Sequence, residues 1–519
     1  MRKSIWLEKS NNNENNLENN KKDKIKQEER NTKETKKDVD VCIIGAGITG
    51  VTCGYELSKL GYTVSIIEKN EIGSGTTGRT TGKITSQHDS FYNYLEESFS
   101  IDTAKKYLEA NEKAINKIES RIKNENIECD FERLNSYIYT TKKEEINQLE
   151  KEFKTLENLN YKCEYVTDMD LPFKIEGGIC FKNQAQFNPI KYINGLVKYI
   201  EEKGNKIYTH TIAKEIKKGE NEKYIVETDK FSISASYVIM SSHYPFFKVK
   251  GLYSAKMYQS MSYLIAIETK KQLPSGMYIS ISNPNITIRK AKYNGKAVLL
   301  IGGGDNKTGK EATYEESYGR LEKFAREYYP DAKILAKWNA QDCITLDKLP
   351  YIGQASNLLP NVYVSTGFKK WGMTLSSVAV DIIVDDIVGR KNEYKDIFLA
   401  SRMQPIKNHE EMKNMLVDSS KALVINKLKE KDVVEKKIKK ETGGIIEVNG
   451  RKVGIYKDEK GEIYAVNPKC THLGCLLVWN QVEKTWDCPC HGSRFNYKGK
   501  NIVEPAYDDL DIIDIYKLY

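Results

Sequence analysis

Two Cys/His pairs near the C-terminus constrain the fold of this chain more than any other feature. Cys470 and His472 form a C-x-H pair, and Cys488 and His491 form a C-x2-H pair. Two thiolates on one iron and two imidazoles on the other can hold a [2Fe–2S] cluster, and neutral imidazoles make its reduced state easier to reach. The segment therefore predicts a redox centre that moves single electrons and is held by two short loops.

A structural zinc site is the main alternative for these residues. Tetrahedral zinc sites usually pair cysteines as C-x2-C, alone or together with H-x3–5-H. Neither pair has that spacing, and each loop carries one further cysteine, Cys475 or Cys490. The spacing favours the iron–sulfur cluster, and a zinc knuckle stays open as the alternative.

The six positions together closely resemble the Rieske iron–sulfur family. The resemblance implies four metal ligands, two thiolates and two imidazoles: Cys470, Cys488, His472 and His491. It also implies a disulfide between Cys475 and Cys490, which is typical of Rieske proteins of respiratory and photosynthetic chains. We therefore expect an all-β Rieske domain over residues 441–519, with short strands at 444–448, 451–457, 462–466 and 511–518.

A glycine fingerprint near the N-terminus predicts a nucleotide site. Residues 39–44 form a short apolar strand, and Gly45, Gly47 and Gly50 follow it directly. The first glycine permits a tight turn, the second permits close approach to a pyrophosphate, and the third permits helix–strand packing. The helix that starts here would direct its N-terminus at the phosphates.

A second strand and an acidic residue complete this nucleotide-binding pattern. Residues 64–67 are apolar, and Glu68 ends the strand 18 residues after Gly50, where a carboxylate can accept a hydrogen bond from a ribose hydroxyl. The neighbouring Lys69 is a further candidate for cofactor binding. A strand, a helix and a second strand in this order predict a Rossmann-like α/β domain.

The next segment favours FAD over NAD. Residues 72–85 are rich in glycine and threonine, and Gly75, Thr76 and Thr77 offer backbone and hydroxyl donors to a flat cofactor. The run resembles the corresponding loop of the D-amino-acid oxidase-like flavoproteins, which include glycine oxidase, sarcosine oxidase and D-amino-acid dehydrogenase. A flexible linker is the alternative, although the embedded Arg79 and Lys83 argue against it.

The same resemblance extends to later segments of the chain. Strand 206–213 would pass the adenine end of FAD, and residues 362–374 read as strand, glycine turn and helix start. The resemblance implies further cofactor-binding residues: Ala213, Gly367, Trp371, Gly372, Met373 and Thr374. Candidates for substrate contact are Tyr258, Arg289, Lys369 and Trp371. Residues 302–305 either approach the flavin or form a hairpin turn, and both interpretations stay open.

Length and composition set the domain organisation. A chain of 519 residues is too long for one core. We predict a polar, disordered tail (1–37) in which residues 4–7 can dock on the body, and an FAD-dependent oxidoreductase domain (38–400). The latter comprises a D-amino-acid oxidase-type α/β FAD-binding domain and an α+β substrate subdomain (about 90–205 and 245–335). A helical, charged connector (401–440) precedes the Rieske domain.

Charge and hydropathy exclude several classes of partner. The net charge is +9, but the lysines alternate with glutamates along helical stretches, which is typical of a solvated surface and not of nucleic-acid binding. No run of about 18 apolar residues occurs, so we expect no transmembrane segment. The N-terminus lacks the apolar stretch of a signal peptide, so a cytoplasmic protein is expected.

Two functions fit these expectations. In the first, an enzyme oxidises an amine or an amino-acid-like molecule at FAD and passes electrons singly through the [2Fe–2S] cluster to a redox protein or a quinone. In the second, an electron-transfer or redox-sensing protein acts on a protein partner without an organic substrate of its own. A Rieske oxygenase is a weaker option, because no other His lies in the context of a mononuclear iron triad.

The sequence also predicts how the midpoint potential of the cluster compares with that of related proteins. In the Rieske family a Ser at the position of Ser493 hydrogen-bonds a bridging sulfide and raises the potential, and high-potential members carry a Tyr two residues later. This chain has Phe495 there, which has no donor. We therefore predict a midpoint potential below that of the cytochrome complexes. A redox titration checks this, and a value as high as theirs would contradict it.

Overall fold

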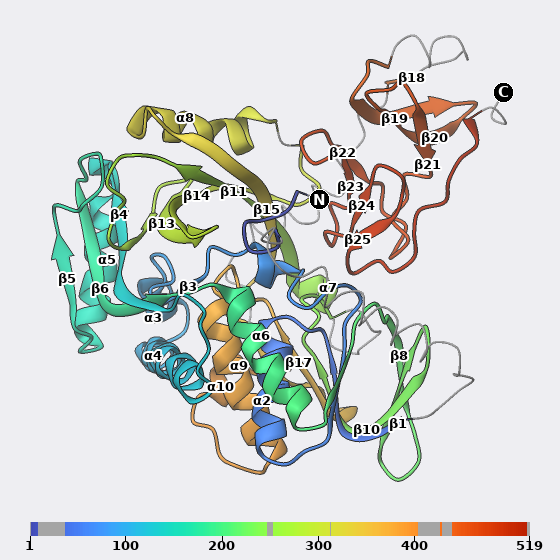
Figure 1. Ribbon diagram of the computed structural model, residues 1–519, viewed down its shortest axis with the longest axis horizontal. Coiled ribbons are helices and arrows are strands. Elements are labelled where there is room, and N and C mark those ends of the chain that lie inside the picture. Colours follow the sequence, from blue (N-terminus) through green and yellow to red (C-terminus); the bar gives the residue numbers. More distant parts are fainter. Residues whose placement is uncertain are drawn as a thin grey trace.

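The computed structural model describes residues 2–8, 37–245, 253–311, 313–402, 426–427 and 438–515. Most of the predicted tail and nearly all of the predicted connector lie outside these residues. Within the described part, no helix is long and apolar enough to cross a membrane. Two large sheets and two small ones carry the fold (Figure 1).

The first large sheet has the order β16-β17-β10-β1-β2-β7, in which β17, β10, β1, β2 and β7 are parallel and β16 is antiparallel to β17; β8 and β9 are attached through β10. Its strands are β1 (Lys37–Ile44), β2 (Val64–Ile67), β7 (Lys206–Tyr208), β8 (Ala213–Lys218), β9 (Tyr224–Thr228), β10 (Ser232–Met240), β16 (Tyr351–Ser356) and β17 (Leu359–Thr366). The apolar end of β1 is buried on both faces, as a central parallel strand requires.

Helices cover one face of this sheet. They are α2 (Ile48–Lys59), α6 (Pro189–Glu202), α9 (Gly372–Ile387) and the short α10 (Lys395–Phe398). Helix α6 begins where the sequence dictates, because the Asn188 side chain accepts hydrogen bonds from the first-turn amides and Pro189 occupies the first helical position. Helices α2, α6 and α9 pack together, and Figure 1 shows them side by side in the lower half of the molecule.

The second large sheet has the order β15-β11-β14-β13-β12-β4-β6-β3, with β5 paired to β6. Its strands are β3 (Lys83–Ile84), β4 (Glu132–Thr140), β5 (Cys163–Val166), β6 (Gly177–Gln186), β11 (Met257–Glu268), β12 (Met277–Ser280), β13 (Ile286–Tyr293), β14 (Lys296–Lys307) and β15 (Lys333–Thr345). Around it lie α3 (Tyr92–Ser98), α4 (Ile101–Asn124), α5 (Ile146–Asn158), α7 (Tyr253–Lys256) and α8 (Arg320–Tyr328). Short helical turns are η2 (Thr76–Arg79), η3 (Lys143–Glu145) and η4 (Glu315–Gly319).

The C-terminal part consists of two four-stranded sheets. One contains β18 (Asn426–Lys427), β19 (Thr442–Val448), β20 (Arg451–Lys457) and β21 (Ile463–Val466), and the other contains β22 (Val478–Asn480), β23 (Thr485–Asp487), β24 (Arg494–Asn496) and β25 (Asn501–Val503). The expected strand at 511–518 was wrong over its described residues: only Ile512 forms an isolated bridge, to Val466. Figure 1 shows this part beside the end of β15.

The N-terminal segment Arg2–Glu8 docks on the body. Ser4, Ile5 and Trp6 are buried, and the two apolar side chains join a core cluster with residues of β11, β14 and β15. The Trp6 indole Nε1 donates to the Thr80 carbonyl at 2.8 Å, and Arg79 donates to the Arg2 carbonyl at 3.0 Å. The segment therefore supports the glycine- and threonine-rich loop from outside.

This contact leads to a stability prediction. Trp6→Ala should lower the free energy of unfolding by about 3 kcal/mol, because a buried indole and its hydrogen bond are lost. Chemical denaturation measures the change. Leu358→Ala, at an exposed leucine, serves as the control and should change it by less than about 0.5 kcal/mol. Equal effects of the two substitutions would contradict the docking.

Candidate functional site

One cavity of about 570 Å³ lies between the two large sheets and reaches the C-terminal part. Most of the predicted cofactor-binding residues line it: Gly45, Gly47, Glu68, Lys69, Gly75, Thr76, Thr77, Ala213, Gly367, Trp371, Gly372 and Met373. Gly50 and Thr374 are not part of its lining. The structure thus brings together segments that are more than 300 residues apart in sequence.

The glycine turn at the start of α2 is sterically fixed. Gly45 has φ +105°, where a side chain would be strained. A Cβ atom at Gly50 would lie 1.9 Å from the Gly45 carbonyl oxygen, so this position needs glycine for helix–turn packing. At Gly47 a Cβ would point at the Thr77 hydroxyl, 3.2 Å away, and would narrow the cavity. This arrangement fits the approach of a pyrophosphate to the backbone.

Glu68 closes the same end of the cavity. One carboxylate oxygen accepts from the Ala46 amide and the other from the Asn70 amide, each at 2.8 Å. Burial raises the pKa of Glu68, while the two amide donors act in the opposite direction. Each oxygen keeps a lone pair for a further donor, so the carboxylate fits a ribose hydroxyl.

At the other end of the cavity the wall is aromatic. The Trp371 ring stacks on the His88 ring with centroids 4.8 Å apart. Burial lowers the pKa of His88 to about 3, so its imidazole is neutral, and its Nε2 lies 3.1 Å from the Thr374 hydroxyl. Thr374 donates to the Thr85 carbonyl, so its side chain lies behind the wall and does not face the cavity.

Charged groups line the remaining wall. Lys370 forms an ion pair with Asp305, and Lys369 and Lys370 both have left-handed backbone, with φ +47° and +71°. Burial lowers the pKa of Lys83 to about 7 and that of Lys369 to about 8, and it raises the pKa of Asp342 to about 6. Strained backbone and shifted pKa values on one cavity wall are typical of functional sites.

Three of the four residues predicted to contact the substrate lie on the cavity wall. Tyr258, Lys369 and Trp371 line the cavity. Arg289 was wrong as a contact: its guanidinium donates to the Gly82 carbonyl at 2.9 Å and lies under the Trp6 ring, so it supports the wall from behind. Residues 302–305 belong to β14 and line the cavity at 302, 303 and 305, so the hairpin-turn interpretation was wrong.

The predicted cluster ligands converge in the C-terminal part. Cys470 and Cys488 are buried, and their thiols lie next to each other. The His472 and His491 rings lie 5.1 Å apart, and in both rings Nδ1 is buried without a hydrogen-bond partner among the described residues. Two adjoining thiols and two orphaned ring nitrogens fit a cluster held by two sulfurs and two nitrogens.

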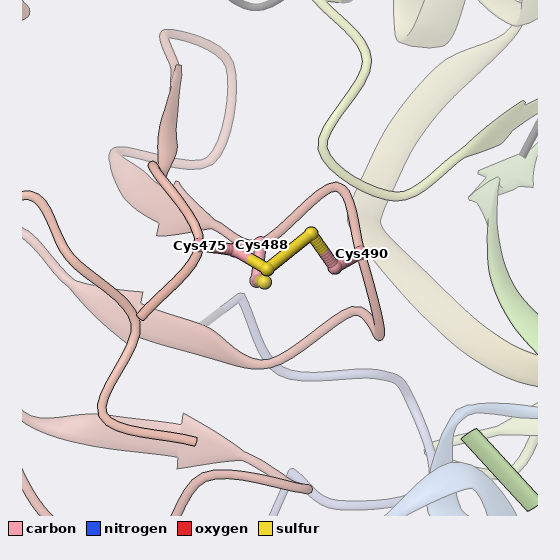
Figure 2. Close-up of side chains that lie close together, drawn as sticks. All are labelled: Cys475, Cys488 and Cys490. Atoms are coloured by element: carbon pink, nitrogen blue, oxygen red, sulfur yellow. A yellow bond between two sulfur atoms is a disulfide. The ribbon is translucent and has the colours of Figure 1, made fainter. Parts of the chain in front are cut away.

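A disulfide lies next to these groups. Cys475 and Cys490 are joined, and their sulfur atoms lie within 4.8 Å of the Cys488 sulfur (Figure 2). Disulfide sulfurs are not thiolates and do not ligate a metal as cysteinate. The trio in Figure 2 therefore offers only Cys488 as a thiolate, which disfavours a zinc site made of these three sulfurs.

Most residues at the boundary between the two centres were not predicted from the sequence; Lys69 is the exception, because it was a candidate for cofactor binding. Lys69 donates to Asn501 and Glu504, and Arg494 lines the cavity while its guanidinium pairs with Asp487. Gln259 and Gln341 contact the cluster loop. None of these contacts has a local sequence signal, because each partner comes from a distant segment.

Comparisons with known proteins cover both parts of the chain. A family model described as "FAD dependent oxidoreductase" matches residues 40–385, and one described as "Rieske [2Fe-2S] domain" matches residues 428–514. A Bacillus subtilis (strain 168) protein named "Putative Rieske 2Fe-2S iron-sulfur protein YhfW" is 38% identical over 476 residues, which is 92% of this chain and 93% of that protein.

Other relatives match the first part alone. "Gamma-glutamylputrescine oxidoreductase" of Escherichia coli (strain K12) is 23% identical over 371 residues, which is 67% of this chain and 84% of that protein. The crystal structure of glycine oxidase from Geobacillus kaustophilus superimposes with a TM-score of 0.61 at 19% identity and covers 71% of this chain and 100% of that chain. At that identity the superposition shows the fold alone.

The buried Lys83 generates a pH prediction. Its pKa is about 7 in the folded protein against 10.5 ordinarily, mainly because of burial, so between these values the unfolded chain binds more protons. Its contribution to stability should therefore rise with pH from 7 to 10.5, by up to about 1.4 kcal/mol per pH unit. Unfolding free energies at pH 7.5 and 9 check this, and Lys83→Met should have the smaller pH slope. Equal slopes in both proteins would contradict the assignment.

Proposed function

The chain belongs to the FAD-dependent oxidoreductase family and carries a C-terminal Rieske domain, and from that premise we propose that it oxidises an amine or amino-acid-like molecule and exports the electrons through its Rieske cluster. The predicted fold class, the enzyme class and the two cofactors, FAD and [2Fe–2S], are confirmed. The observation that carries the proposal is the cavity itself, because residues of the FAD part and of the Rieske part line it together.

FAD, when bound, would supply two-electron oxidation of the substrate, and a bound [2Fe–2S] cluster would supply one-electron transfer, so each substrate molecule would require two single-electron transfers to an external acceptor. Glu68 and the turn at Gly45 and Gly47 would hold the nucleotide end of FAD. The amides that begin α9 at Gly372 would stabilise negative charge at the ring end. Trp371 and the neutral His88 would exclude water there.

The cavity wall supports an amine substrate. Oxidation of a C–N bond requires the unprotonated nitrogen, and cationic surroundings lower the pKa of a neighbouring ammonium. Lys83 and Lys369 lie on the wall and themselves lose part of their charge near neutral pH. Lys369, which keeps more of its charge at neutral pH than Lys83 does, would attract a substrate carboxylate. The relatives named as a glycine oxidase and a gamma-glutamylputrescine oxidoreductase agree with this substrate class.

The proposal also includes an acceptor for the electrons and a cellular compartment for the protein. A one-electron redox protein or a quinone would collect the electrons, and we expect both reactions in the cytoplasm. The disulfide between Cys475 and Cys490 is unusual in that compartment, and its position against the cluster loops would shield it from reduction.

Removal of the cluster should separate the two half-reactions. In Cys488→Ser the substrate should still bleach the flavin anaerobically, while turnover with a one-electron acceptor protein such as cytochrome c falls at least about tenfold, because the exit is lost. Cys180→Ser, at a buried cysteine of β6, is the matched control and should retain turnover. Unchanged turnover in Cys488→Ser would contradict the electron route.

An anaerobic screen tests the substrate. Amines and amino acids are mixed with the oxidised protein, and loss of flavin absorbance identifies a substrate. If none bleaches the flavin while a redox protein reduces or oxidises it, the chain is an electron-transfer or sensing protein without an organic substrate, and the proposal is wrong.

A further inference from the structure

Strands β11 and β15 line the cavity and also contact the cluster loop 488–493. Side chains alternate along a strand, so neighbouring residues face opposite sides. On β11, Tyr258, Ser260 and Ser262 line the cavity, whereas Gln259 between them faces the cluster loop. Strand β11 thus lines the cavity through these three residues and contacts the predicted ligand loop through Gln259, while Gln341 of β15 does both.

Two buried glutamines bind that loop. Gln259 Nε2 donates to the His491 carbonyl at 2.8 Å and to the Glu504 carbonyl at 3.2 Å. Gln341 Nε2 donates to the Gly492 carbonyl at 2.7 Å and to the Gln259 side-chain oxygen. Gln259 is 2% exposed and Gln341 is 5% exposed. Each glutamine therefore donates to backbone carbonyls of the C-terminal part, and the two glutamines are bonded to each other.

Glycines in the cluster loop and in the segment after β14 allow this close contact. Gly492 has φ +78°, and a Cβ there would lie 2.6 Å from the Gln259 Cβ. Gly309 has φ +81°, and a Cβ there would lie 2.4 Å from Pro489 backbone atoms. Glycine on each side lets the loop approach the wall more closely than any other residue would permit.

The contact continues into the cofactor loop. The Gln341 carbonyl accepts from the Thr76 hydroxyl at 2.9 Å, and Thr76 lines the cavity on η2. A short hydrogen-bonded path thus runs from the His491 backbone through Gln259 and Gln341 to the loop predicted to hold FAD.

We propose that Gln259 and Gln341 form an amide bridge that fixes the His491 side of the cluster against the FAD cavity, so that electrons cross a permanently docked interface. The inference rests on the proposed electron route and names the residues that position it. Holding two reacting groups in one geometry makes their reaction unimolecular and independent of domain movement. Without the bridge the Rieske domain stays tethered, so transfer would continue but would require docking in each cycle.

The test uses the full-length protein loaded with both cofactors. A deazaflavin flash reduces the bound FAD anaerobically, and absorbance then follows electron transfer to the cluster, without any amine substrate. In the wild-type protein the rate should be unchanged by glycerol. In Gln259→Met it should fall about tenfold, the effect of one or two lost bonds to buried carbonyls, and should become viscosity-dependent.

A second substitution at Gln259, a control variant and a hydrogen-exchange measurement complete the test. Gln259→Glu keeps the shape but places an acceptor against two carbonyls, so it should be slower than Gln259→Met. Gln354→Met is the matched control and should behave like wild type, because the Gln354 amide donates to the Ser356 carbonyl within β16. Hydrogen exchange of residues 488–493 should accelerate in the Gln259 variants, while the cluster EPR spectrum and midpoint potential stay unchanged.

Specific results would overturn the amide bridge. A viscosity-dependent rate in the wild-type protein, which needs no variant to fold, would show that docking is not permanent. Unchanged rate and unchanged exchange in Gln259→Glu would show that the glutamines do not position the loop. Because light, and not a substrate, reduces the FAD, this experiment tests the amide bridge independently of amine oxidation. Either hypothesis can therefore be contradicted while the other is supported.

Discussion

Hydrogen bonds from two buried glutamines to the backbone of loop 488–493 hold the two redox parts of this chain together. Gln259 and Gln341 come from the sheet that forms the cavity wall, and their acceptors include His491, a predicted ligand. A carbonyl that is buried and loses its hydrogen-bond donor lowers the stability of the protein by about 1–3 kcal/mol. Contact between the sheet and the cluster loop is therefore more stable than separation of the two. The cavity, the cofactor loop and the cluster loops are therefore neighbours, although they are distant in sequence.

Local chemistry explains what the sequence could predict. The turn at Gly45 and Gly50 leaves no room for a Cβ, so its glycines mark the turn in any fold that contains it. The pairs Cys470/His472 and Cys488/His491 each lie on a single loop, and their convergence follows from the short strands between them. For the same reason the strands at 451–457 and 39–44 were placed within two residues of their ends.

Contacts between distant segments explain which residue positions could not be predicted from the sequence. Arg289 faces away from the cavity because Gly82 and Trp6 take its guanidinium, and neither is near it in sequence. Thr374 turns to Thr85 for the same reason. Gln259 carries no motif, since a glutamine in a strand acquires its role only when a distant loop presents its carbonyl groups. The strand expected at 511–518 was wrong for the same reason, because in the described part Ile512 finds only one bridge, to the distant Val466.

The dependence of intramolecular electron transfer on protein concentration tests the central claim most directly. After anaerobic reduction of the bound FAD, the cluster should be reduced in a first-order process whose rate constant is the same at all protein concentrations. A rate that rises in proportion to protein concentration would show that electrons pass between molecules, and it would contradict a cavity and a cluster coupled within one chain.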